Sequence, residues 1–367
     1  MNRPGLPPIK YNSQARLIPA SILKIATAAE ALSVLGPDFR FRTEFYQTPE
    51  GDLIIKGLGD PFLTSEEIAL ISGRLSQRLN TIPTRILIDQ SAFELNGRAE
   101  GTESSLNPYD AGNAALAVNF NTIKIKVADD RTISSAEPQT PTLPIMQVFG
   151  GKKEPGKHRL NISGSENSAG RYAGQLLAAS LIPKISLDSK TPELCPISTF
   201  EGKLPPEPVY VHYSSRKLTE VVEAMLLYSN NFIANQLFLV CGARKYGYPA
   251  TWAKGRQALN RFLGRDLGLP EHSFRIKEGA GISKDNLLTA EAMLRIIKEF
   301  RPYAHLLPDY QGHLLKTGTM TGVYNYAGYH RTDKGLRPLV IMLNQEENNR
   351  DRLLRLILDQ DNIPSLP

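Results

Sequence analysis

Residues 21–35 of this chain read SILKIATAAEALSVL, and two shorter stretches, SNN at 229–231 and KTGT at 316–319, follow it in that order. The first stretch is rich in alanine and leucine, which predicts a mostly buried helix. The Gly36-Pro37 pair that follows ends this helix. These three stretches carry most of what the sequence predicts about fold and chemistry.

Ser21 and Lys24 form a candidate nucleophile and its base. A serine hydroxyl is a weak nucleophile unless a neighbouring base takes its proton. Residues three apart lie on one face of a helix, so Lys24 Nζ can reach Ser21 Oγ. A lysine is a base only when neutral, which burial or a nearby positive charge such as Lys316 favours.

The stretch at 229–231 breaks a helical region into two, as a short loop at a cleft does. We expect Ser229 to pass a proton to a leaving amine, and Asn231 to hold both Lys24 and a substrate amide. The pattern S-x-N is weak by itself, because 105–107 and 165–167 repeat it. Likewise 214–217 repeats S-x-x-K, but in a polar turn.

The stretch at 316–319 is more specific, since Lys-Thr-Gly occurs once in the chain. Lys316 and Thr317 on a strand edge suit a terminal carboxylate, and Gly318 allows a close approach to that strand. The backbone N–H groups of Ser21 and Thr319 are candidates for an oxyanion hole. The motif set S-x-x-K, S-x-N and K-T-G is typical of serine acyl-transfer enzymes.

The rest of the chain predicts a mixed α+β fold in two units. We expect a catalytic unit made of residues 1–47 and 206–367, interrupted by an inserted β-rich unit at 48–205. Apolar periodicity and turn residues predict the elements by range. Helices are expected at 65–79, 169–181, on both sides of 229–231, at 253–267, 288–300 and 350–361, and strands at 39–47, 52–57, 85–89, 122–127, 158–163 and in three runs from 312 to 345.

Composition excludes several classes of protein. The net charge is only +6 and no block of like charges appears, so no nucleic-acid partner is expected. No apolar run is long enough for a transmembrane segment. The six histidines lack paired metal spacing, so we expect no metal and no cofactor. Cys195 and Cys241 can be free thiols or one disulfide, and the sequence leaves this open.

The sequence resembles the low-molecular-mass class C penicillin-binding proteins, the D-Ala-D-Ala carboxypeptidase/endopeptidase family called peptidase S13. The resemblance extends beyond the three motifs to LGPDFRF at 35–41, GLGDP at 57–61, GAGISKDN at 279–286 and YAGY at 326–329. It implies a penicillin-binding-protein/β-lactamase-like domain, with an antiparallel sheet flanked by helices and an inserted domain after the nucleophile. In this chain the insertion is short, so a third domain seen in the family is expected to be reduced or absent.

The resemblance also implies a function and a set of residues. It implies a serine hydrolase that cleaves the terminal D-Ala-D-Ala bond of peptidoglycan stem peptides, as well as cross-links between D-Ala and a diamino acid, through an acyl-enzyme inhibited by β-lactams. Family members use an acidic residue of the inserted domain to contact the side-chain amine of the stem peptide, and Asp110 occupies a similar place. The implied catalytic residues are Ser21, Lys24, Ser229, Asn231 and Lys316, and the implied substrate-binding residues are Thr317, Gly318, Thr319 and Asp110.

Two alternatives remain open from the sequence. One is an esterase or β-lactamase on the same fold, and the other is a non-catalytic cell-wall-binding protein that retains the motifs. A peptidoglycan hydrolase is expected in the periplasm or at the exterior of the cell envelope, yet residues 1–8 (MNRPGLPP) lack the apolar core of an export signal. We therefore expect Met1 to mark a truncated start. The sequence makes no prediction of the oligomeric state.

Overall fold

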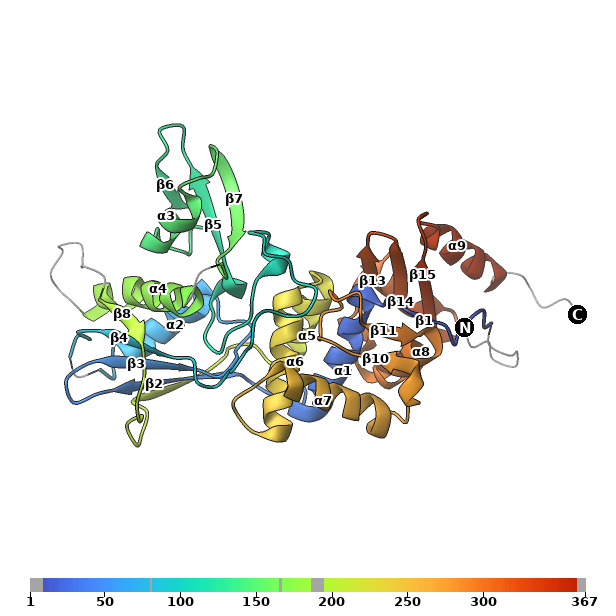
Figure 1. The fold of residues 1–367 in the computed structure, drawn as a ribbon, viewed down its shortest axis with the longest axis horizontal. Coiled ribbons are helices and arrows are strands. Elements are labelled where there is room, and N and C mark those ends of the chain that lie inside the picture. Colours follow the sequence, from blue (N-terminus) through green and yellow to red (C-terminus); the bar gives the residue numbers. More distant parts are fainter. Residues whose placement is uncertain (1–8, 80, 165–166, 186–194, 362–367) are drawn as a thin grey trace, which may run out of the picture.

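The computed structural model describes residues 9–79, 81–164, 167–185 and 195–361, and it has two lobes side by side (Figure 1). The split lobe combines residues 9–41 with 214–361, and the inserted lobe comprises residues 42–213. Residues 1–8 and 362–367 lie outside the described range.

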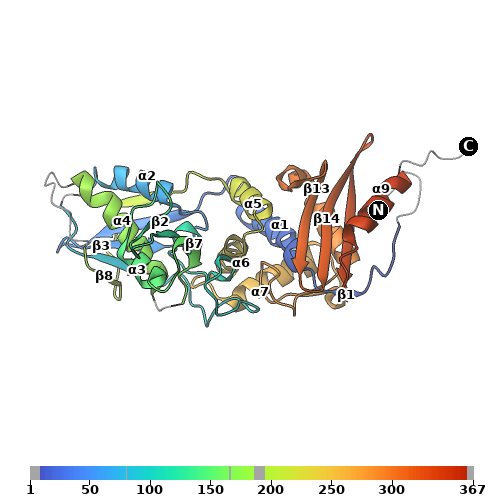
Figure 2. The same ribbon diagram turned by 90° about the horizontal axis from the view of Figure 1, so that it is seen from above.

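The split lobe is built on an antiparallel sheet of order β12-β13-β14-β15. One face packs on the main helical core and the other face carries α9, as Figure 2 shows. Alternation along the strands explains this, because successive side chains point to opposite faces: Ile341 faces α9 while Met342 joins the main core. The strands are β12 (Asp309–Tyr310), β13 (His313–Met320), β14 (Val323–Thr332) and β15 (Gly335–Asn344), and α9 is Arg350–Asp361.

Helix α1 lies at the centre of the helical layer. It spans Lys24–Leu35, and every residue from 24 to 32 is buried. A helix that is apolar on most sides needs neighbours all round, and α1 contacts each of the other helices named here. These are α5 (Leu218–Leu227), α6 (Asn231–Tyr246), α7 (Trp252–Arg261) and α8 (Ala290–Glu299). Near them β1 (Arg16–Leu17), β11 (Leu287–Thr289) and β10 (Phe274–Arg275) form a small sheet.

The helix predicted from Ser21 begins differently. Residues Ala20–Leu23 form a 3₁₀ turn, η1, and the α-helix proper begins at Lys24. The helix expected at 253–267 also divides, because α7 ends at Arg261 and Phe262–Asp266 continue as a π-helical segment.

The inserted lobe has its own core under a five-stranded sheet of order β8-β4-β3-β2-β9. β2 and β3 are antiparallel, whereas β3 pairs with β4, and β4 with β8, in parallel. A second sheet, β6-β5-β7, stands beside it (Figure 1). The elements are β2 (Arg42–Gln47), β3 (Leu53–Gly57), α2 (Ser65–Leu75), β4 (Ile86–Asp89), β5 (Thr122–Val127), β6 (Ile133–Ser135), α3 (Pro144–Gly150), β7 (Gly156–Asn161), α4 (Ser168–Ile185), β8 (Ile197–Thr199) and β9 (Tyr210–Tyr213).

The strand pairing puts β2 and β9 in the inserted lobe, although the sequence analysis placed both in the catalytic unit. Phe45 of β2 and Tyr210 of β9 stack with ring centroids 5.7 Å apart, inside the core of the inserted lobe. Phe41, just before β2, belongs to the core of the split lobe. The chain therefore crosses between the lobes at about residues 41–42 and 213–214. Each strand belongs to the lobe whose core contains its aromatic side chain.

Cys195 and Cys241 are both free. Cys241 is buried in α6 of the split lobe, and Cys195 lies in the inserted lobe, so the alternative left open by the sequence is settled. Across the described residues, no helix has the length and apolar character that a membrane crossing needs.

Candidate active site

Lys24 connects three parts of the split lobe. Its Nζ lies 3.0 Å from Ser21 Oγ, 2.8 Å from Asn231 Oδ1 and 2.6 Å from the carbonyl oxygen of Ala280. The side chain is fully buried. A neutral Nζ has one lone pair and two N–H groups, so it can accept the Ser21 proton while donating to Asn231 and Ala280.

The surroundings of Lys24 favour that neutral form. Burial lowers the pKa of Lys24 well below its usual range, and the positive charge of Lys316 lowers it further. The carboxylate of Glu278 acts in the opposite direction but is the smallest of the three influences. An amine with a lowered pKa next to a serine hydroxyl is suited to act as a general base.

Lys316 forms the second arm of the site. Its Nζ donates to Ser229 Oγ at 2.9 Å and to the carbonyl oxygen of Thr317 at 3.0 Å. Burial, with a smaller contribution from the Arg350 charge, lowers the pKa of Lys316 to about 8. The hydroxyl of Ser229 therefore has a proton source within hydrogen-bond distance.

Local backbone geometry explains how Ser229 and Asn231 reach this position. Helix α5 ends at Leu227, and Ser229 has a left-handed φ of 53°. Asn230 then caps α6, since its Oδ1 accepts a hydrogen bond from the Ile233 backbone N–H at 3.0 Å. Left-handed backbone at a non-glycine residue is costly and concentrates at functional sites.

The loop at 278–286 supports Lys24, a role that we did not predict from the sequence. Glu278 is fully buried, and its carboxylate accepts hydrogen bonds from Ala280 N at 2.7 Å, Ile282 N at 2.8 Å and Asn286 Nδ2 at 2.6 Å. These bonds fix the turn that presents the Ala280 carbonyl to Lys24. The sequence signal that could have pointed to Glu278 was the GAGISKDN segment at 279–286, which follows it directly and resembles the family.

The nucleophile turn is attached to strand β13. A Cβ added at Gly318 would lie 2.7 Å from the carbonyl oxygen of Pro19. Asn325, in the neighbouring strand β14, donates to the carbonyl oxygens of Ile18 at 3.0 Å and Pro19 at 2.8 Å. In this structure the backbone just before Ser21 lies against Gly318. We expected substrate to approach the strand at this position.

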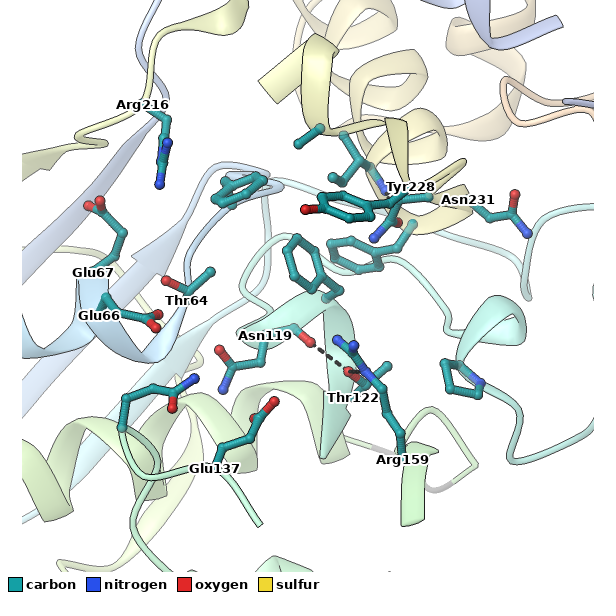
Figure 3. Close-up of a pocket in the computed structure, with 18 of the residues that line it drawn as sticks. Thr64, Glu66, Glu67, Asn119, Thr122, Glu137, Arg159, Arg216, Tyr228 and Asn231 are labelled. Atoms are coloured by element: carbon teal, nitrogen blue, oxygen red, sulfur yellow. Dashed lines mark hydrogen bonds between the residues drawn. The ribbon is translucent and has the colours of Figure 1, made fainter. Parts of the chain in front are cut away.

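An open cleft of about 760 Å³ leads from this site to the inserted lobe. Figure 3 shows Tyr228 on the α5–α6 side, across the cleft from Thr122, Glu137 and Arg159 of the inserted lobe, whereas the Asn231 side chain points away from these three. Phenylalanine rings and side chains of both charges line the rest. Such a mixed lining suits a ligand with apolar and charged groups.

Asp110 is close to this cleft but does not line it. Its side chain is 1% exposed and accepts hydrogen bonds from the Glu103 backbone N–H and the Ser105 hydroxyl. Its neighbour Tyr109 does line the cleft, and the Tyr109 carbonyl accepts a bond from Asn231 Nδ2 at 3.1 Å. The Asp110 carboxylate is thus used inside its own loop in this structure, and its contact with a substrate amine stays a prediction.

The model of the D-Ala-D-Ala carboxypeptidase 3 (S13) family matches residues 5–159 and 196–308 of the chain. The chain belongs to this family. The predicted family, the α+β fold class and the class of serine D-Ala-D-Ala carboxypeptidases are thereby confirmed. The matched ranges contain Ser21, Lys24, Ser229 and Asn231, and they end before Lys316.

Individual relatives agree with this assignment. The D-alanyl-D-alanine carboxypeptidase DacB of Haemophilus influenzae is 23% identical over 387 residues, which cover 89% of this chain and 80% of the relative. The crystal structure of penicillin binding protein 4 (dacB) from the same organism superposes with a TM-score of 0.73 at 19% identity, covering 93% of this chain and 88% of the other. The penicillin G acylated Bd3459 predatory endopeptidase of Bdellovibrio bacteriovorus has a TM-score of 0.54 at 16% identity, with 96% and 85% covered.

Proposed function

We propose that this chain hydrolyses the D-Ala-D-Ala bond of peptidoglycan stem peptides through an acyl-enzyme at Ser21. The observation that carries the proposal is the buried Lys24 Nζ at 3.0 Å from Ser21 Oγ, with its pKa lowered. Family membership and the penicillin G acylated relative support the same chemistry.

In the first step Lys24 takes the Ser21 proton, and Ser21 Oγ forms a bond to the carbonyl carbon of the penultimate D-Ala. The carbonyl oxygen becomes an oxyanion, for which the backbone N–H groups of Ser21 and Thr319 are the proposed donors. The negative charge develops in a site that already holds the positive charge of Lys316, which stabilises it.

In the second step the C–N bond breaks and the leaving amine needs a proton. Ser229 Oγ can donate its own proton and take one from Lys316 Nζ, which lies 2.9 Å away. The free D-Ala departs, leaving an ester at Ser21. Before hydrolysis Lys24 gives up to solvent the proton that it took from Ser21, and Lys316 regains one from solvent, so Lys24 is again neutral. Lys24 then takes a proton from the water that attacks the ester and passes it to Ser21 Oγ, which restores the Ser21 hydroxyl and releases the shortened peptide.

Carboxypeptidase and endopeptidase reactions share these steps and differ in the amine that leaves. The cleft of about 760 Å³ beside Asn231 is large enough for a substrate longer than a dipeptide. We therefore include cleavage of D-Ala-diamino acid cross-links in the proposal. Because peptidoglycan lies outside the inner membrane, we propose that the enzyme acts in the periplasm or at the exterior of the cell envelope.

The test is release of free D-Ala from a pentapeptide stem and of monomers from cross-linked muropeptides, for the wild type and Ser21→Ala. We expect the wild type to release D-Ala and the variant to release none. Rapid turnover of nitrocefin without D-Ala release would instead favour a β-lactamase. Binding to sacculi without any acyl adduct would favour a non-catalytic wall-binding protein.

A further inference from the structure

Arg350, the first residue of helix α9, reaches the end of the KTGT segment. Its Nη1 donates to Thr319 Oγ1 at 2.7 Å, and its guanidinium carbon lies 4.6 Å from the centre of the Tyr326 ring. Helix α9 thus brings a permanent positive charge to the strand that also carries Lys316.

Neighbouring contacts hold the start of α9 in place. Asp351 Oδ1 accepts hydrogen bonds from the hydroxyl groups of Tyr326 at 2.5 Å and Tyr310 at 3.3 Å. Asn348 Oδ1 accepts a bond from the Arg350 backbone N–H at 3.4 Å. A side chain fixed in this way loses little freedom when it binds a ligand.

The part of the protein that the structure describes does not neutralise the two cations. Among the described residues, no carboxylate lies within ion-pair distance of Arg350 or Lys316. The Arg350 Nε is buried without a hydrogen-bond partner, and Thr319 is the acceptor that the described chain provides for Nη1. A site with two cations and unused donors has a positive field that favours an anion.

We propose that Arg350 is a specificity residue that binds the C-terminal carboxylate of the substrate, together with Thr319 and Lys316. This inference rests on the proposed function. A guanidinium offers parallel N–H groups that match the two oxygens of a carboxylate, which an ammonium cannot do. The family match ends at residue 308, so it assigns no role to α9.

The consequence is a preference for a free C-terminus. An amide at the same position has the same shape but no charge, and leaves the two cations uncompensated. Arg350 should therefore discriminate between acid and amide forms of one peptide.

The experiment compares acetylated L-Lys-D-Ala-D-Ala with its C-terminal amide as substrates. We expect Arg350→Gln to lower kcat/KM for the acid by about 10- to 100-fold, which is the effect of losing one or two charged hydrogen bonds. The amide should change less than about 2-fold. Arg350→Lys should recover part of the loss, and Arg352→Gln, an exposed position on the same helix, should leave both substrates unchanged.

Equal losses for acid and amide would overturn the inference, because they would show that Arg350 only supports the fold. No loss for the acid would overturn it as well. An NMR titration of Ser21→Ala with both peptides separates this inference from the proposed function, since it needs no turnover. If the wild type cleaves neither peptide, the proposed function fails. Ser21→Ala can still support the role of Arg350, if it binds the acid more tightly than the amide and Arg350→Gln abolishes that preference. Equal binding of both peptides to Ser21→Ala overturns the role of Arg350.

Discussion

At the scale of single residues, Lys24 and Lys316 need opposite protonation states. Lys24 must be neutral to take a proton, and Lys316 must be charged to supply one. Burial and the charge of Lys316 lower the pKa of Lys24 well below its usual range, whereas burial and the smaller effect of Arg350 leave the pKa of Lys316 at about 8. The pair therefore keeps the base deprotonated at a pH where the acid still holds its proton.

This difference predicts a bell-shaped pH profile for acylation of Ser21. The rate should rise with pH as Lys24 loses its proton, and fall above pH 8 or so as Lys316, whose pKa is about 8, loses its own. Lys316→Gln removes the charge that lowers the pKa of Lys24, so the rising limb should move to higher pH and the falling limb should vanish. The measurement is the rate of penicillin acylation from pH 5 to 11.

Lys334→Gln, at an exposed turn between β14 and β15, is the control for this profile. An unchanged profile in Lys316→Gln would contradict the assignment of the two lysines.

At the scale of elements, the site depends on the contact between η1 and β13. Gly318 lies against Pro19 and Ile22, and Asn325 holds the carbonyl oxygens just before Ser21. The nucleophile is thus positioned by a strand that is distant in sequence.

We predict that Gly318→Ala separates the two elements. The added Cβ would lie 2.7 Å from the Pro19 carbonyl oxygen and 3.2 Å from Ile22 atoms, so η1 must shift. A displacement near 1 Å is expected to lower the acylation rate by roughly 100-fold. Gly73→Ala in α2, where a Cβ meets nothing within 4 Å, is the matched control. A fully active Gly318→Ala would show that the contact does not position Ser21.

Local patterns predicted most elements because their causes are local. The apolar run at 21–35, the break at 229–231 and the three final strands all appear near the expected residues. The burial of Asp110 could not be predicted from local patterns, because it depends on how residues 103–105 fold over its side chain. Arg350 and Glu278 were missed for a similar reason: each acts through contacts made by the tertiary fold.

At the scale of the whole molecule, the two lobes meet where residues 107–114 of the inserted lobe contact α6. Gln236 of α6 is fully buried, donates to the Ala114 carbonyl at 2.7 Å and accepts from Asn113 Nδ2 at 2.8 Å. In the same region Asn231 donates to the Tyr109 carbonyl. The domain boundaries could not be read from composition, because β2 and β9 belong to the inserted lobe through their pairing with each other and the packing of Phe45 on Tyr210.

Gln236→Leu should weaken this contact between lobes. It leaves the Ala114 carbonyl and the Asn113 amide without that partner, and we expect the free energy of unfolding to fall by about 1–3 kcal/mol. Denaturant unfolding measures the loss, and Gln257→Leu on the exposed side of α7 is the control. If both variants unfold like the wild type, the contact contributes nothing to stability.

The whole proposed reaction depends on a covalent acyl-enzyme at Ser21. Intact-protein mass spectrometry after treatment with penicillin G tests for this acyl-enzyme most directly. We expect the wild type to gain the mass of one penicillin, on the proteolytic peptide that contains Ser21, and Ser21→Ala to gain none. An unmodified wild type, or the same adduct on Ser21→Ala, would contradict it.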